Sequence, residues 1–140
     1  MKEKTAHILD SGDEVVSTST LPFIAETVVA TLQHEAETAN KYLEVIEFNI
    51  TQNQVLKIFE EETGVTFTRT HGNTVDIEKD GYAKLAKGDH SAFFNFLFVY
   101  NFRDNAGHPV KKEDWANKQL GLPESSLRAA IKEYIKSRSE

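Results

Sequence analysis

Residues 42–70 read YLEVIEFNITQNQVLKIFEEETGVTFTRT and carry the clearest local pattern of the chain. Tyr42–Phe48 alternates between apolar and polar side chains, as a strand does. The motif TQNQ has the spacing of a capping box, and it opens a helix over Gln52–Thr63 that Gly64 is placed to end. Val65–Thr70 alternates again. Strand, helix and strand over so few residues predict a βαβ unit with two parallel strands.

The residues before this unit predict a hairpin and a helix. Lys4–Leu9 and Glu14–Thr18 have the character of strands, and the turn residues DSGD between them favour a hairpin. Serine and threonine caps and Pro22 then open a helix that ends near His34. Its apolar residues recur at spacings of three and four, and we expect them to form one buried stripe: Leu21, Ile24, Ala25, Val28, Val29 and Leu32.

The residues after this unit are mainly helical in pattern. We expect helices over Val75–Lys87 and Ala92–Arg103, a short helix over Trp115–Leu120 and a last helix after Pro123. The last helix has one apolar stripe, formed by Leu127, Ala130, Ile131, Tyr134 and Ile135. The predicted fold class is therefore α/β, with a small mixed sheet that contains a βαβ unit and about six helices. No boundary divides the sequence, so we expect residues 1–140 to form a single domain.

The composition narrows the functional classes. Hydrophobic residues make up 39% of the 140 residues and charged residues 27%, which is ordinary for a globular protein. The net charge of −6 argues against direct nucleic-acid binding, and the longest apolar stretch is too short for a membrane span. The chain has no cysteine, which excludes thiol catalysis and cysteine-ligated metals. We expect a cytoplasmic protein, with a nuclear location as the alternative.

The common catalytic and cofactor motifs are missing. The sequence contains no Gly-x-Gly-x-x-Gly turn, no P-loop and no His-Glu-x-x-His helix. The five histidines lack the spacing of a local metal site. His90 precedes the aromatic segment described next and is either an acid–base group or a surface residue. We therefore assign no catalytic residue, no cofactor and no metal ion to this chain.

The most unusual segment is AFFNFLFVYNFR, residues 92–103, which holds five of the nine phenylalanines. A helix that is apolar on nearly every side must be covered by the core, by a ligand or by a partner chain. These three alternatives remain open on the sequence. We expect one row of this helix to be core and the other to border a cavity for a flat, apolar ligand. The candidate substrate-binding residues are Phe93, Phe94, Leu97, Phe98 and Tyr100.

Several short motifs, taken in order, resemble one known family. They are Phe23-Ile-Ala25, Asn40-Lys-Tyr-Leu43, Ile50-Thr-Gln-Asn-Gln54, Glu62-Thr-Gly64, Leu85 with Gly88-Asp89, and Asn117 with Leu120-Gly-Leu-Pro123. Together they resemble the C-terminal, substrate-domain part of the fungal NmrA-like and isoflavone-reductase-like proteins, which are atypical relatives of the short-chain dehydrogenases. The family has an acidic residue where this chain has Phe23, and Thr20 is placed to replace it as a helix cap.

The resemblance implies two alternative functions. Full-length members bind NAD(P) through an N-terminal Rossmann region that this chain does not match, so the chain resembles a truncated member without its own dinucleotide site. The first hypothesis is a relative of the NAD(P)-dependent oxidoreductases of fungal secondary metabolism that binds a small apolar or aromatic molecule. The second is a non-catalytic regulatory protein that acts through protein–protein contact. Because the Rossmann region is missing, we also expect apolar surface to be covered by a homo-oligomer or a partner protein.

Overall fold

The chain is organised in two compact units, each made of two separate stretches of sequence. The structure, a computed structural model, describes residues 4–107 and 109–138. Unit 1 comprises Met1–Val16 and Ile50–His108, and unit 2 comprises Ser17–Asn49 and Pro109–Glu140. The expectation that residues 1–140 form a single domain stays a prediction.

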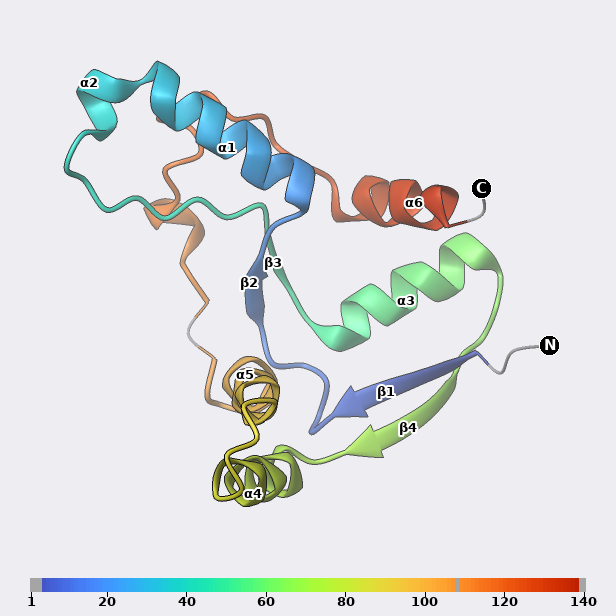
Figure 1. The fold of residues 1–140 in the computed structure, drawn as a ribbon. Coiled ribbons are helices and arrows are strands. Elements are labelled where there is room, and N and C mark those ends of the chain that lie inside the picture. Colours follow the sequence, from blue (N-terminus) through green and yellow to red (C-terminus); the bar gives the residue numbers. More distant parts are fainter. Residues whose placement is uncertain (1–3, 108, 139–140) are drawn as a thin grey trace. The chain divides into compact units, whose positions relative to one another are not determined.

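A parallel pair of strands forms the sheet of unit 1. Strand β1 (Thr5–Leu9) pairs with β4 (Thr68–Gly72), and the two arrows run side by side in the same direction (Figure 1). Helix α3 (Gln52–Thr63) precedes β4 in the sequence and contacts β1. Strand β1, helix α3 and strand β4 therefore form a βαβ unit with a long insertion between its first strand and its helix.

Helix α3 has the predicted bounds. Thr51 and Gln54 form both hydrogen bonds of the capping box, and Gly64 ends the helix with φ of 66°. The side-chain amide of Gln52 donates to the carbonyl of Leu9 and accepts from its backbone amide, both at 3.1 Å. This reciprocal pair joins the start of the helix to the end of β1.

Two sequence-based strand pairings are wrong. The predicted hairpin is not formed, because β1 pairs with β4 and the backbone amide of Asp10 extends that pairing by donating to the carbonyl of Gly72 at 3.0 Å. The following turn is held on α3, where the amide of Asn53 donates to the carbonyl of Gly12 at 3.1 Å. The first strand of the βαβ unit is therefore β1 and not Tyr42–Phe48.

A second, two-stranded sheet is formed by β2 (Val16–Thr18) and β3 (Phe48–Ile50). The segment before Phe48, which we predicted as a strand, is irregular over residues 41–46, and Tyr42 at its start is 89% exposed. The α/β fold class and its six helices are nevertheless confirmed in the described part of the chain.

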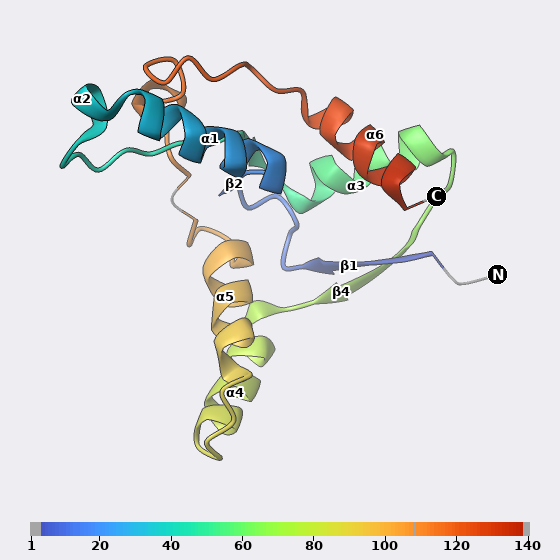
Figure 2. The same cartoon turned by 45° about the horizontal axis from the view of Figure 1, so that its top comes forward.

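Two helices of unit 1 lie side by side as a hairpin (Figure 2). They are α4 (Thr74–Leu85) and α5 (Ala92–Phe102), the latter being the aromatic helix. Gly81 of α4 faces α5 so closely that a Cβ atom there would lie 3.0 Å from the Cβ of Asn95. The glycine thus permits the close approach of the two helices.

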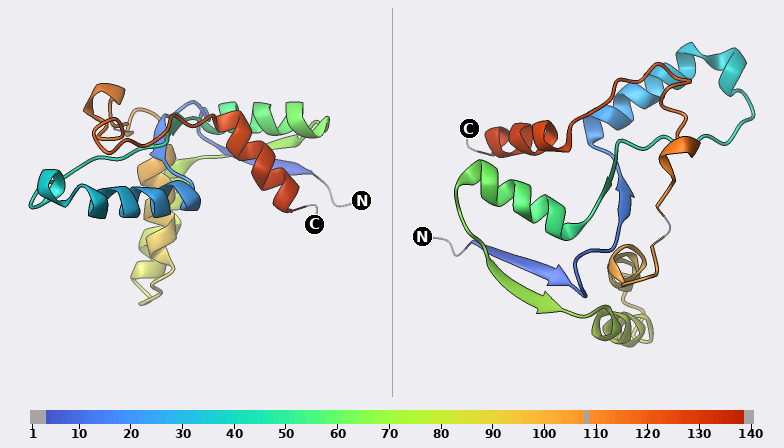
Figure 3. Two further views of the ribbon diagram at one scale, coloured as in Figure 1. Left: turned by 90° about the horizontal axis from the view of Figure 1, so that it is seen from above. Right: turned by 180° about the vertical axis from the view of Figure 1, so that it is seen from behind.

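Unit 2 contains the remaining helices (Figure 3). They are α1 (Leu21–Gln33), the short α2 (Glu35–Thr38), the 3-10 helix η1 (Lys112–Asp114) and α6 (Leu127–Ser137). The helix predicted over Trp115–Leu120 is absent, and η1 followed by turns stands in that region. The buried hydrophobic residues of unit 2 are Phe23, Ala30, Phe48, Ala116, Leu120 and Ile131.

The face that α1 buries differs from the prediction. Phe23 and Ala30 are 3% and 8% exposed, whereas the predicted stripe is exposed over its whole length, with Leu21 at 82% and Ile24 at 47%. Apolar residues occur on both sides of this helix, so periodicity identified the helix and its end but not its buried side. Thr20 caps the helix as expected, since its hydroxyl accepts from the amide of Phe23 at 3.4 Å.

Candidate functional site: two adjoining cavities of unit 2

Two cavities of about 480 and 740 Å³ in unit 2 share Glu47 and Ser125 in their walls. The smaller cavity is lined mainly by the segment after η1, with Phe23, Lys112, Trp115, Asn117, Lys118, Gly121, Leu122, Pro123 and Glu124. The larger is lined by the start of α1 and by α6, with Thr20, Leu21, Pro22, Ser126, Ala129, Ala130, Glu133, Tyr134 and Ser137. Volumes in this range suit a small organic ligand.

Glu47 is held in place by the cap of α1. Its Oε2 atom accepts two hydrogen bonds from Thr20, one from the backbone amide and one from the hydroxyl, each at 2.7 Å. Its backbone amide donates to the hydroxyl of Ser19 at 3.1 Å. None of the hydrogen bonds found among residues 4–107 and 109–138 uses Oε1 of Glu47. The carboxylate is thus fixed by one oxygen and retains acceptor capacity at the other.

The wall of the smaller cavity is fastened to residues 44–46. The side-chain amide of Asn117 donates to the carbonyl of Ile46 at 2.6 Å and accepts from its backbone amide at 3.3 Å. The amide of Ala116 donates to the carbonyl of Glu44 at 2.8 Å. These contacts hold the Trp115 region against the segment that leads to Glu47.

The cavities offer aromatic surface and a hydrogen-bond acceptor. Trp115 donates its indole N–H to the carbonyl of Val110 at 3.1 Å, which fixes the ring, and the ammonium of Lys112 lies 6.0 Å from the ring centroid. Lys112 also pairs with Glu124 at 3.5 Å. Tyr134 supplies a second ring on the α6 side. The arrangement suits a small, mostly apolar molecule that donates a hydrogen bond to Glu47.

The predicted substrate-binding residues lie elsewhere, on α5 of unit 1. Phe93, Phe94 and Tyr100 are 60–67% exposed, and Leu97 and Phe98 are 41% and 46% exposed. The expectation that one row of this helix is core is wrong, because its buried residues are Ala92, Asn95 and Val99 on the side towards α4. The participation of the five residues in ligand binding stays a prediction.

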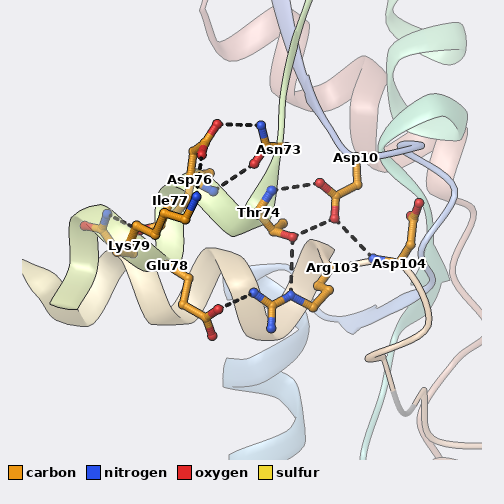
Figure 4. A network of polar contacts seen from close by, with 10 residues as sticks. Asp10, Asn73, Thr74, Asp76, Ile77, Glu78, Lys79, Arg103 and Asp104 are labelled. Carbon is orange, nitrogen blue, oxygen red and sulfur yellow. Dashed lines mark hydrogen bonds and ion pairs between the residues drawn. The ribbon is translucent and has the colours of Figure 1, made fainter.

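A polar network connects the carboxyl end of β1 with the start of α4 and with Arg103 in unit 1 (Figure 4). The Asp10 carboxylate accepts from the amide and hydroxyl of Thr74, at 2.7 and 2.6 Å, and from the amide of Asp104 at 3.3 Å. Burial alone would raise the pKa of Asp10, but these hydrogen bonds and the nearby charge of Arg103 outweigh it and lower the pKa. Arg103 in turn pairs with Glu78 at 2.8 Å.

This network does not fit a dinucleotide. In α/β folds a pyrophosphate binds at the carboxyl end of a strand, on the free amides of a helix N-terminus. Here the first amide of α4, that of Thr74, is already bonded to Asp10. Asp104 and Glu14 add further carboxylates, and both accept hydrogen bonds at this edge, from Ser11 and Asn105 respectively. The negative charge would repel a pyrophosphate, so the network acts as a structural connection.

The described residues contain neither a metal-binding cluster nor a membrane-spanning helix. No group of three or more histidine, aspartate or glutamate side chains among residues 4–107 and 109–138 is arranged to hold a metal ion. In the same part of the chain, no helix has the length and apolar character needed to cross a membrane.

Comparison with solved structures relates the fold to a known enzyme. The chain superimposes on a crystal structure of isoflavone reductase with a TM-score of 0.64 over 96% of its length, at 13% sequence identity. It therefore has an isoflavone-reductase-like fold. It covers 44% of that reductase chain, so the likeness concerns part of the enzyme.

Comparison of sequences finds a fungal relative that is described as an oxidoreductase. The chain is 33% identical over 111 residues to the oxidoreductase poxI of Penicillium oxalicum. The aligned part is 79% of this chain but only 35% of poxI, so the chain spans about a third of that relative. No protein-family model matches the sequence. The structural likeness agrees with the isoflavone-reductase-like fold that the motifs indicated.

Some residues that line the cavities were already noticeable in the sequence. The motif Asn117 with Leu120-Gly-Leu-Pro123 carried part of the resemblance, and Asn117 and Pro123 line the smaller cavity. Thr20 was expected as a cap, and its second bond, to Glu47, places the carboxylate between the cavities. Glu47 itself was missed, because it stands in the segment that we predicted as an ordinary strand.

Proposed function

We propose that this chain is the ligand-holding part of an NAD(P)-dependent oxidoreductase related to the isoflavone-reductase-like proteins of fungal secondary metabolism, without a dinucleotide site of its own. The relationship to oxidoreductases is supported by the fold and by the sequence of poxI. Carboxylates at the edge where a pyrophosphate would bind support the absence of a dinucleotide site. The hydride-transferring cofactor would then be supplied by a region that this chain does not match.

The proposed ligand is a small, largely apolar molecule with a hydroxyl group. The observation that carries this proposal is the position of Glu47, which borders both cavities and is fixed through one carboxylate oxygen by Thr20. A ligand hydroxyl that donates to the second oxygen forms a charge-assisted hydrogen bond. The rings of Trp115 and Tyr134 and the apolar start of α1 would hold the remainder of the molecule by burial.

The proposal is testable with two probes that differ in one hydrogen-bond donor, 4-cyclohexylphenol and its methyl ether. The only tryptophan of the chain, Trp115, lines the smaller cavity, so its fluorescence reports binding directly. We expect saturable binding of the phenol and at least tenfold weaker binding of the ether, since a hydrogen bond to a charged group contributes about 1.5–3 kcal/mol. Equal affinities for the two probes would contradict the role of Glu47.

Two variants in the cavity walls and one control variant sharpen this test. Glu47→Gln keeps an acceptor for Thr20 but removes the charge, and should shrink the difference between the probes. Tyr134→Ala should weaken the binding of both probes, whereas Tyr42→Ala, at an 89% exposed position of the same unit, should leave it unchanged. If neither probe alters the emission of Trp115 in the parent chain, the smaller cavity does not bind this class of ligand, and the proposed contact with Trp115 is refuted.

A further inference from the structure

The aromatic side chains of α5 form one continuous surface. At 100° per residue, Phe93, Phe94, Leu97, Phe98 and Tyr100 fall within an arc of roughly 160°. This arc, which we call the α5 face, lies opposite the side that packs on α4. Its five residues are all 41–67% exposed. The two rows expected from the sequence are therefore neighbouring parts of one outward surface.

The α5 face stands on a fixed support. On the inner side of α5, the side-chain amide of Asn95 donates to the carbonyl of Ile77 and to Asp80, both at 2.9 Å, and accepts from Lys84 at 3.0 Å. The rings of Tyr82 and Phe96 meet edge to face, with centroids 5.1 Å apart. Because α4 and α5 are joined by specific polar and aromatic contacts, the face is presented in one geometry.

The apolar area of the α5 face is as large as the patches that often serve a function on a monomer. An aromatic side chain offers about 150–250 Å², so these half-exposed residues present on the order of 500 Å² of nearly continuous apolar surface. The largest apolar patch of a typical monomer is about 300–600 Å² and is often functional. A stable interface takes about 800 Å² from each partner. Two such faces together bury on the order of 1,000 Å², which is about the least that a specific interface needs.

The charge of the face favours a second copy of the chain over other occupants. From Ala92 to Phe102 no side chain is charged at neutral pH, so two such faces meet without like-charge repulsion. In an antiparallel pair, the start of the helix of one copy lies beside the end of the helix of the other. The helix dipoles are then also opposed. Asn101, the polar residue of the arc, donates to the carbonyl of Leu97 in its own helix at 2.8 Å.

We propose that the α5 face is a self-association surface, at which two copies of this chain pair antiparallel about a twofold axis. In such an isologous contact, a residue before the centre of the helix meets the residue that lies equally far after the centre in the other copy. Only the central residue meets its own counterpart. Leu97 is the middle residue of Ala92–Phe102. The geometry therefore sets Leu97 of one copy beside Leu97 of the other.

This position allows a test that only self-pairing passes. Leu97→Glu sets two carboxylates against each other at the axis, and Leu97→Lys sets two ammonium groups against each other. Each should raise the dissociation constant of the dimer by about a hundredfold or more, since like charges at an interface cost several kcal/mol. An equimolar mixture of the two variants should recover dimers, because the opposite charges then meet. Sedimentation equilibrium at tens of micromolar measures the molecular mass of the parent, of each variant and of their mixture.

We expect the parent to have twice the 15.8 kDa of one chain, and each variant alone to have the single mass. Val28→Glu, at a 54% exposed apolar position of α1, is the matched control and should remain dimeric. Far-ultraviolet circular dichroism confirms that each variant is folded. A monomeric parent, a dimeric Leu97→Glu or a mixture that stays monomeric would each overturn the proposal. A monomeric parent in which Leu97→Glu weakens binding of 4-cyclohexylphenol would assign the face to a ligand instead.

Discussion

Asp10 and Thr74 are joined by two hydrogen bonds across a separation of 64 residues, from the Thr74 amide at 2.7 Å and from its hydroxyl at 2.6 Å. Thr74 is the most deeply buried side chain described, at 1% exposure, and it begins α4. Asp10 follows β1 with φ of 49°, a conformation that aspartate and asparagine tolerate better than most residues. The pair therefore fixes the α4–α5 hairpin to the end of the parallel sheet.

Replacing Asp10 should destabilise the fold in proportion to the bonds removed. Asp10→Ala removes every acceptor and places alanine at a positive φ, and should cost about 3 kcal/mol of unfolding free energy. Asp10→Asn keeps one acceptor and tolerates the same φ, and should cost about 1 kcal/mol. Urea denaturation measures the unfolding free energy of both variants. Asp114→Ala is the control, because that carboxylate makes no hydrogen bond found in the described part of the chain, and it should stay within about 0.5 kcal/mol of the parent.

The same carboxylate should make stability depend on acid pH. The hydrogen bonds from Thr74 and Asp104 outweigh the effect of burial and lower the pKa of Asp10 in the folded state. A lowered pKa contributes stability above the ordinary value near 4, and this contribution disappears as the pH falls through the folded-state pKa. We therefore expect the urea midpoints of the parent and of Asp10→Asn to differ at neutral pH and to converge as the pH falls below the ordinary aspartate pKa and through the lowered folded-state pKa. Curves that stay parallel would contradict this assignment.

The contact between α4 and α5 should not tolerate a branched side chain at Gly81. A Cβ atom there would lie 3.0 Å from the Cβ of Asn95 and 3.2 Å from the ring of Phe96. Gly81→Val should therefore cost about 2–3 kcal/mol through overpacking. Ala83→Val, at an exposed position of the same helix, isolates the helix propensity of valine and should cost only about 0.5 kcal/mol. Equal losses in the two variants would show that the helices can separate without penalty.

The chain should not bind NADH or NADPH with useful affinity. The sequence has no glycine-rich turn, and the amide of Thr74 at the start of α4 is bonded to Asp10. Calorimetric titration at millimolar cofactor should give only the heat of dilution. A saturable isotherm with a micromolar dissociation constant would require a nucleotide site in this chain and would refute that part of the proposed function.

Local features of the fold could be predicted from the sequence. The bounds of α3 follow from the Thr51 capping box and from Gly64, whose signals act within a few residues. The end of α1 near His34 was likewise predictable. Strand pairing could not be obtained in this way, because β1 and β4 are far apart in the sequence and the residues between them offer nearer partners. The hairpin and the strand over Tyr42–Phe48 were plausible locally and were excluded by tertiary contacts.

The candidate site was predictable only in part. The aromatic residues of α5 were conspicuous in the sequence, but their exposure depends on which side of the helix meets α4, and Asn95 and Gly81 determine that side. The cavities depend on Glu47, whose carboxylate is positioned by Thr20, 27 residues earlier. A contact between such distant residues leaves no periodic signal in the sequence. The motif around Asn117 was the one local indication.

The pairing of β1 with β4 also bears on the order in which the protein acquires its structure during synthesis. His7 and Thr70 face each other in the register and are 63 residues apart. At about 5–20 residues per second, a ribosome needs roughly 3–12 s to make the intervening segment. During that interval Ile8 and Leu9 lack β4, the strand with which they pair in the folded chain. The parallel pair can therefore form only after Gly72 has been synthesised.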